Sequence, residues 1–174
     1  MLDVSISYNR YKFLGYEYLT WLWFLIENGQ DQIKKLEQES VSLQIGNRIV
    51  LENMKKDTVE SITIKGDDAD LEEGVLALRK GAVVTELQLA YKTGDQEWRF
   101  TIKGESLHMA GLVCPRTGAV YSQEDLEGAV LEKVYLYEKA IQFTDNLFKQ
   151  FITLRVSEDW SKKVVPRMKR WIRS

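Results

Sequence analysis

The chain is poor in the residues on which much enzyme chemistry depends. It has one cysteine, one histidine and two prolines among its 174 residues. A single cysteine excludes an internal disulfide and a thiolate-rich zinc site, and the single histidine, His108, excludes a metal centre built from several histidines. Neither a GxGxxG loop nor a Walker sequence is present, which argues against a nucleotide-driven motor. We expect no cofactor, no bound metal and no small-molecule substrate.

Long apolar runs are also missing. The most apolar stretch, residues 16–26, is interrupted by Glu17 and is too short to span a bilayer. The N-terminus carries Asp3 and lacks an apolar core ending at a small-residue cleavage site, so it does not resemble a signal peptide. We expect a cytoplasmic protein without membrane contact.

The chain does have enough apolar residues to form a hydrophobic core. Hydrophobic residues make up 44% and charged residues 29%, a balance that excludes a disordered chain. Folding at this size buries about two thirds of the surface of the unfolded chain. The length predicts one domain, or two lobes at most.

The net charge of −2 hides an asymmetry. Segment 157–174 has six basic residues and only two acidic ones, so its net charge is +4 and the rest of the chain carries −6. An acidic body with a basic end can still approach a polyanion, because the local field matters more than the total charge.

Hydrophobic periodicity predicts an α+β fold: an antiparallel sheet meander with flanking helices and a long C-terminal helix. Alternation predicts a hairpin in 41–53 that turns at Gly46-Asn47, and further strands at 58–65, 83–91, 97–103 and 107–113. Helical spacing predicts helices over 16–28 and from Leu71 to Gly81, and one helix or more over 123–152. Residues 30–40 suggest a connector or short helix. Pro166 makes 157–174 a broken helix or a tail with a helical end.

Three sets of residues invite a catalytic interpretation, and each has a simpler one. The acidic cluster that includes Asp68 and Asp70 fails the calcium-loop spacing and suits a helix N-terminus, although a metal-dependent nuclease remains an alternative. Glu97 and Glu105 lie on a predicted hairpin beside basic neighbours, which favours cross-strand charge pairing. Nothing marks His108 and Cys114 as a base and its nucleophile. We therefore do not expect an enzyme.

The basic end, WSKKVVPRMKRWIRS, is the most suggestive feature. Lysine and arginine neutralise phosphates without reading sequence, and rings such as Trp160 and Trp171 can stack on bases or anchor in an interface. A nucleic-acid contact, an acidic-membrane contact and a solvated tail all remain open from spacing alone.

Four stretches of the chain resemble RdgC, a recombination-associated DNA-binding family of bacteria, specifically its C-terminal half. They are LTWLW (19–23), DLEEGVLALRKGAVVTELQLAY (70–91), EWRFTIK (97–103) and LEKVYLYEKAIQFTDNLFKQF (131–151). The match spans roughly residues 16–156, with the four stretches in consistent order. The resemblance implies a homodimer that encloses duplex DNA, binds it without sequence preference and restrains RecA-mediated strand exchange at the nucleoid.

The chain departs from that family in two ways. The family's N-terminal half has no counterpart here, which puts a closed ring in doubt, and the strand end before the short helix holds only one cation, Lys65. We divide the chain into an RdgC-like domain, 1–156, and a basic C-terminal segment, 157–174.

We expect a non-enzymatic binder of double-stranded DNA that acts on recombination or replication. The alternative is a protein-interaction or dimerisation module that has kept the fold without DNA binding. The expected phosphate contacts, followed by the secondary candidates, are Lys162, Lys163, Arg167, Lys169, Arg170 and Arg173, then Lys65, Arg79 and Lys80.

Overall fold

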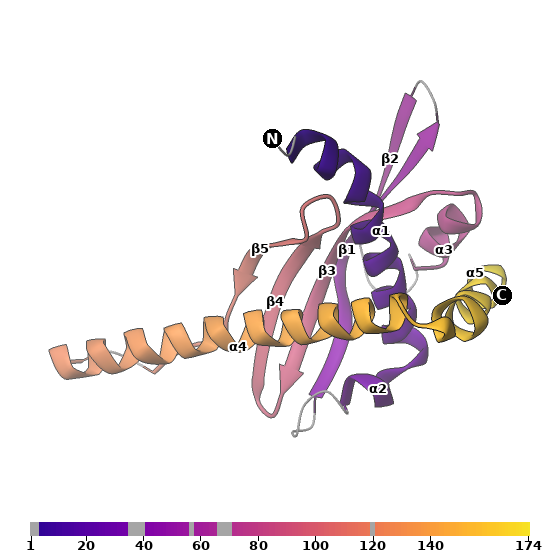
Figure 1. Cartoon of the computed structure of the whole chain (residues 1–174). Helices are drawn as coiled ribbons and strands as arrows, with labels where there is room; N and C mark the ends of the chain where they lie inside the picture. Colours follow the sequence, from indigo (N-terminus) through magenta and orange to yellow (C-terminus); the bar gives the residue numbers. More distant parts are fainter. Residues whose placement is uncertain (1–3, 35–40, 56–57, 66–70, 119–120) are drawn as a thin grey trace.

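The chain folds as one antiparallel sheet with helices packed against it, which confirms the predicted α+β class (Figure 1). The computed structural model describes residues 4–34, 41–55, 58–65, 71–118 and 121–174. The helices are α1 (Val4–Asn28), α2 (Gln30–Lys34), α3 (Leu71–Arg79), α4 (Gln123–Arg155), a π-helical turn η2 (Trp160–Val164) and α5 (Val165–Arg173). The strands are β1 (Val41–Lys55), β2 (Thr58–Lys65), β3 (Val83–Thr93), β4 (Gln96–Lys103) and β5 (His108–Val113).

The five strands lie in the order β2-β1-β3-β4-β5, and every neighbouring pair is antiparallel. Strands β3, β4 and β5 form the predicted meander. The predicted hairpin turn at Gly46-Asn47 is wrong, because β1 continues through it. Ile45 pairs with Leu89 and Ile49 with Leu87, so the residues between them form a bulge, whose Asn47 N–H donates to Gln88 Oε1 at 3.0 Å. Glycine and asparagine are common in turns and in bulges alike. Because β1 pairs with β3 both before and after Gly46-Asn47, these residues form a bulge and not a turn.

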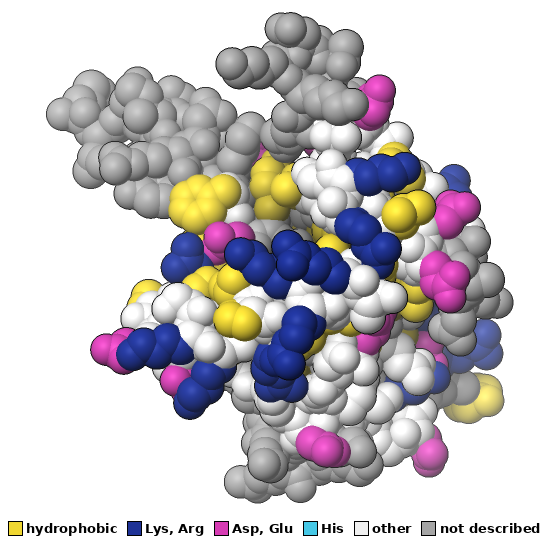
Figure 2. Space-filling model, turned by 90° about the vertical axis from the view of Figure 1, so that its right-hand side faces the viewer, with side chains coloured by type: hydrophobic (Ala, Val, Ile, Leu, Met, Phe, Trp, Pro, Cys, Tyr) yellow, Lys and Arg dark blue, Asp and Glu magenta, His cyan; other side chains and the backbone are white. Residues whose placement is uncertain are grey.

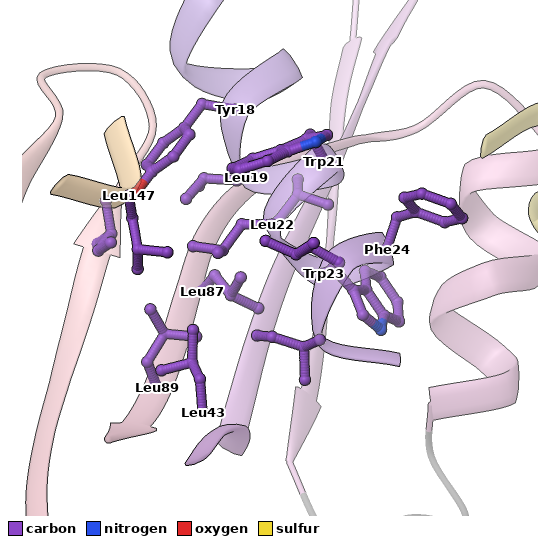
Figure 3. Close-up of a cluster of buried hydrophobic side chains, with 14 of the residues drawn as sticks. Tyr18, Leu19, Trp21, Leu22, Trp23, Phe24, Leu43, Leu87, Leu89 and Leu147 are labelled. Atoms are coloured by element: carbon purple, nitrogen blue, oxygen red, sulfur yellow. The ribbon is translucent and has the colours of Figure 1, made fainter. Parts of the chain in front are cut away.

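One face of the sheet holds the core (Figure 3). Leu87, Leu89 and Tyr91 alternate along β3 and are completely buried beneath α1 and α4. The Tyr91 ring stacks on Phe143 of α4 with centroids 4.0 Å apart, and the Trp98 indole N–H donates to the Leu136 carbonyl at 2.9 Å. Helices α1 and α4 therefore cover the same face, as the period-two pattern of the strands requires.

Helix α1 is buried on more than one side, as its sequence predicts. It begins at Val4, earlier than the predicted start. Trp21 packs against Phe151 of α4, and Trp23 packs against Trp171 of α5, with ring centroids 5.5 Å apart in both pairs. This chain therefore covers both tryptophans itself.

Helix α4 is a single helix, capped by Ser122, whose hydroxyl accepts a hydrogen bond from the Asp125 N–H at 3.1 Å. Its C-terminal part buries a stripe of residues at helical spacing: Leu136, Ala140, Phe143, Leu147 and Phe151. Its N-terminal part projects past β5, away from the sheet (Figure 1). No helix in the described part of the chain is both long enough and apolar enough to cross a bilayer.

The Tyr18 hydroxyl is buried without a hydrogen-bond partner among the described residues. Burial, and secondarily the charge of Asp145, raises the pKa of Tyr18 above its usual value. A raised folded-state pKa gives stability that is complete below the unfolded pKa of about 10 and is lost as the pH rises past it.

We expect Tyr18→Phe to change the free energy of unfolding by less than about 1 kcal/mol at neutral pH. In urea titrations at about pH 7 and about pH 11, the variant should lose less stability than the parent, and an equal loss would contradict the prediction.

Candidate nucleic-acid interface

The basic C-terminal segment is helical over most of its length. The π-helical turn η2 leads directly into α5, which continues to Arg173. Pro166 follows the π-helical turn directly, and the Val165 N–H before it donates to the Trp160 carbonyl. The helical path therefore continues through the proline instead of breaking there, and the solvated-tail interpretation does not describe the segment.

Aromatic and apolar side chains fix α5 against the rest of the molecule. Met168 is buried, and the ring of Trp171 lies 5.5 Å from Trp23 and 5.7 Å from Phe24, centroid to centroid. The Trp171 indole N–H donates to Glu27 Oε2 at 2.7 Å. The sequence left open whether Trp171 stacks on bases or anchors in an interface. In the structure it is anchored within the chain.

Trp160 has the same kind of environment. It is 8% exposed and packs edge-on against Phe151 of α4, at a centroid distance of 5.5 Å. The Arg155 guanidinium lies over the Trp160 ring, 5.4 Å from its centroid. Neither tryptophan of the basic segment is available as an open stacking platform for bases.

Because the apolar side of α5 faces α1, its cations lie on the solvent side. Arg170 and Arg173 lie opposite the buried Met168 on the helix, and Arg167 and Lys169 flank them. Arg167 also lies over the Phe24 ring, 5.7 Å from its centroid. None of these four cations forms an ion pair with a carboxylate of the described residues.

Figure 2 shows the consequence at the surface. Lysine and arginine side chains gather on the side of the molecule where α5 lies, while acidic side chains are scattered toward its margins. We call the solvent side of α5, formed by Arg167, Lys169, Arg170 and Arg173, the basic face.

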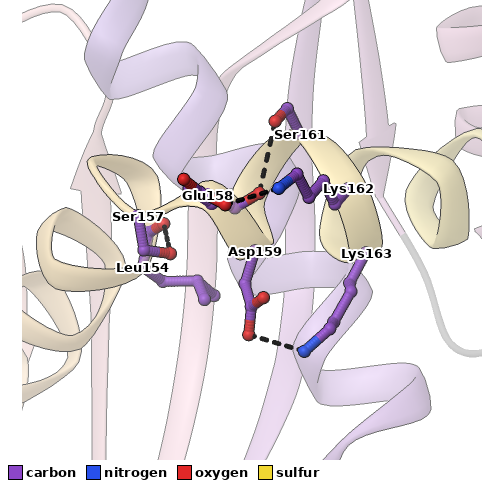
Figure 4. A network of polar contacts seen from close by, with 7 residues as sticks. All are labelled: Leu154, Ser157, Glu158, Asp159, Ser161, Lys162 and Lys163. Carbon is purple, nitrogen blue, oxygen red and sulfur yellow. Dashed lines mark hydrogen bonds and ion pairs between the residues drawn. The ribbon is translucent and has the colours of Figure 1, made fainter.

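Lys162 and Lys163 differ from these four residues (Figure 4). Lys162 forms an ion pair with Glu158, and Lys163 Nζ lies 2.9 Å from Asp159 Oδ2, both at a spacing of four residues. The lysine side chains are 67% and 69% exposed, so the pairs are solvated and weak. They nevertheless make the net charge of this turn zero, so the positive charge of the segment lies on α5.

Of the secondary candidates, the structure joins one directly to α5. Arg79, the last residue of α3, donates from Nε to the Ile172 carbonyl at 3.0 Å. Lys80 follows it and is exposed, which extends the basic surface toward α3. Lys65 lies at the end of β2, opposite Arg48 of β1, and no contact within the described residues links it to α5.

The open face of the sheet carries a second set of cations that the sequence analysis missed. Arg48 and Lys103 lie 3.2 and 3.6 Å from the carboxylate of Glu86, and Lys92 and Arg99 lie 3.2 and 2.6 Å from that of Glu97. Four cations thus share two carboxylates, and Lys92, Glu97 and Arg99 line a groove of about 600 Å³ at the β1 bulge. These cations occupy the solvent-facing positions of alternating strands, which the sequence shows. Which cation meets which carboxylate depends on how the strands are aligned with one another, which the sequence does not show.

The remaining candidates do not form catalytic arrangements. The ion pairs of Glu97 with Arg99 and Lys92 confirm charge pairing for that residue, and Arg99, then Lys92, lower its pKa. Burial raises the pKa of the Cys114 thiol, and His108 Nδ1 is hydrogen-bonded to Ser106 Oγ at 2.5 Å. Asp68 and Asp70 lie outside the described residues, within which no group of three His, Cys, Asp or Glu side chains is placed to hold a metal.

Comparisons of the chain with family models, curated proteins and solved structures give no match. The features of the chain that bear on its function are the basic face of α5 and the sequence stretches described above.

Proposed function

We propose that this chain binds double-stranded DNA through its phosphates, without sequence preference, and that the basic face of α5 makes the contact. The observation that carries the proposal is a set of four cations without carboxylate partners in the described structure, on a helix whose opposite side is fixed by Met168 and Trp171. A fixed helix presents its charges with little additional ordering on binding. Over the roughly 9 Å from Arg167 to Arg173, duplex DNA presents several phosphates.

The composition of the face supports binding without sequence preference. Lysine and arginine neutralise phosphates on any sequence, and segment 157–174 contains no asparagine or glutamine, the usual readers of adenine. The ion-paired Lys162 and Lys163 would contribute phosphate contacts only at short range, where phosphates displace Glu158 and Asp159.

The resemblance to RdgC supports the same function and suggests its setting. On that basis the chain would act without catalysis in recombination or replication, at the nucleoid, by restraining RecA-type strand exchange. The basic face supplies the DNA contact in this proposal, and Arg79 and Lys80 extend it.

Fluorescence anisotropy with two labelled duplexes of unrelated sequence tests the proposal. We expect similar affinities for the two, and an affinity that falls linearly in a plot of log K against log salt. Four phosphate contacts predict a slope of about −3.6. Absence of binding at low salt, or a strong preference for one sequence, would contradict it.

A second candidate function is a protein-interaction module that has kept the fold without binding DNA. The apolar residues exposed on the projecting part of α4 favour it. A chain that associates with itself, and ignores both duplexes at low salt, would support this alternative over DNA binding.

A further inference from the structure

A pocket of about 190 Å³ lies beside the basic face, where α1, α2, the end of α4 and the η2–α5 segment meet. Its volume is below the roughly 300 Å³ at which sites for drug-sized ligands begin, so it suits a single ring system. Arg167 lines this pocket and also belongs to the basic face. DNA that lies on the basic face therefore lies next to the pocket.

The floor of the pocket is apolar and fixed. Trp21 and Leu25 are each 2% exposed and Phe24 is 7% exposed, so all three side chains are anchored in the core. The Trp21 ring packs against Phe151 with centroids 5.5 Å apart, and Arg167 lies over the Phe24 ring. A pocket with a rigid floor needs little further ordering when a ligand enters it.

The walls of the pocket carry both donors and acceptors. Asn28 donates from Nδ2 to the Phe24 carbonyl at 3.1 Å; within the described residues, its side-chain oxygen and second N–H have no partner, and neither has the Gln32 side chain. Asp159 and its ion-pair partner Lys163 project from the same side of their segment (Figure 4). Carboxamides pair with adenine, and carboxylates accept from the amino group of cytosine, so these walls match the edge of a nucleobase.

We infer that this pocket takes an unpaired nucleobase, turned out of a duplex that lies on the basic face. The inference rests on the proposed function and names its preferred substrate, duplex DNA with an extrahelical base. Lys163 and Arg167 contact the phosphates beside that base, and the apolar floor replaces the stacking that the base has lost. In a perfect duplex the bases stay paired and do not reach the pocket, so binding there has no sequence preference.

An acidic peptide with an aromatic side chain is the other ligand that an apolar pocket beside cations suggests. Asp159 lies in the wall of this pocket and would repel the carboxylates of such a peptide. A neutral base can instead donate a hydrogen bond to the same carboxylate. The composition of the walls therefore favours the nucleobase.

Fluorescence anisotropy with three duplexes of the same flanking sequence tests the inference. One duplex is perfect, one has an additional unpaired adenine, and one has an abasic nucleotide at that position. We expect the unpaired adenine to tighten binding about tenfold, because contact with aromatic side chains favours the bound base and an unpaired base is easily extruded. The abasic duplex bends as easily and lacks only the base, so it should bind like the perfect duplex.

Two uncharged substitutions address the pocket itself. Val164→Phe places a larger side chain in the pocket and should abolish the preference for the unpaired adenine, whereas Gln32→Ala removes one polar group and should reduce it about threefold. Affinity for the perfect duplex should stay within about twofold of the parent in both. Gln142→Ala, at an exposed glutamine of α4 that does not line the pocket, is the matched control and should keep the full preference. Circular dichroism checks that each variant folds, and Gln32 is exposed, so its variant provides the test even if Val164→Phe does not fold.

Equal affinity for the adenine and abasic duplexes, or a preference for adenine that Gln32→Ala and Val164→Phe leave intact, would overturn the inference and leave the proposed function standing. Equal affinity for all three duplexes, with a phenylalanine-containing acidic peptide that binds the parent but not Val164→Phe, would overturn it in favour of a protein ligand. Absence of binding to all three duplexes would overturn the proposed function as well.

Discussion

Replacing Arg170 and Arg173 together by glutamine is expected to weaken duplex binding at least about tenfold at low salt. These two residues lie at the centre of the basic face, opposite the buried Met168, and none of the described carboxylates pairs with them. Glutamine keeps much of the side-chain length but removes the charge, so two phosphate contacts and their counterion release are lost. The slope of log K against log salt should therefore become less steep by about 1.8.

A matched control separates local contact from total charge. Arg116 and Lys133 are exposed and lie before and within α4, outside the basic face. Their joint replacement by glutamine removes the same net charge and should change the affinity less than about threefold. Equal losses in the two variants would mean that the field of the whole molecule governs binding, and the basic face would lose its assigned role.

Replacing Gly15 by alanine is expected to lower the free energy of unfolding by at least about 2 kcal/mol. A Cβ at this position would lie 1.8 Å from the carbonyl oxygen of Gly104, which follows β4. The Gly104 backbone has little freedom to withdraw, because its N–H donates to the Thr85 carbonyl at 2.8 Å. Helix α1 would have to move away from the sheet, and thermal or urea denaturation would report the loss.

Gly128 provides the opposite case within a helix. A Cβ there meets no atom of the described residues within 4 Å, so Gly128→Ala should only remove the helical penalty of glycine and stabilise by up to about 1 kcal/mol. A destabilisation of similar size in both variants would show that the approach of α1 to Gly104 is not what makes Gly15 necessary.

The sequence was sufficient for the elements whose burial follows a simple period. Strands β3 and β4 alternate apolar and polar residues, and apolar residues recur at helical spacing along α4, so these three elements were predicted close to their observed bounds. The bulge in β1 was not predictable from Gly46-Asn47, because the choice between turn and bulge depends on β3, which lies some forty residues further along.

The candidate site was predictable as a list of cations but not as a surface. Sequence alone could not show that Trp171 would dock beside Trp23, or that Arg79 would reach the Ile172 carbonyl from another helix. The neutralisation of Lys162 had a local signal, since Glu158 precedes it by four residues at helical spacing. That signal was usable only once the segment was known to be a helix and not a tail.

The central claim is that duplex DNA contacts the basic face, and mapping that contact by NMR tests it most directly. A short duplex of random sequence would be titrated at low salt into the ¹⁵N-labelled chain, with backbone amide shifts followed residue by residue. We predict that the changes concentrate in η2, in α5 and at the end of α3. Changes confined to the open face of the sheet or to α4, or no changes at all, would contradict the claim.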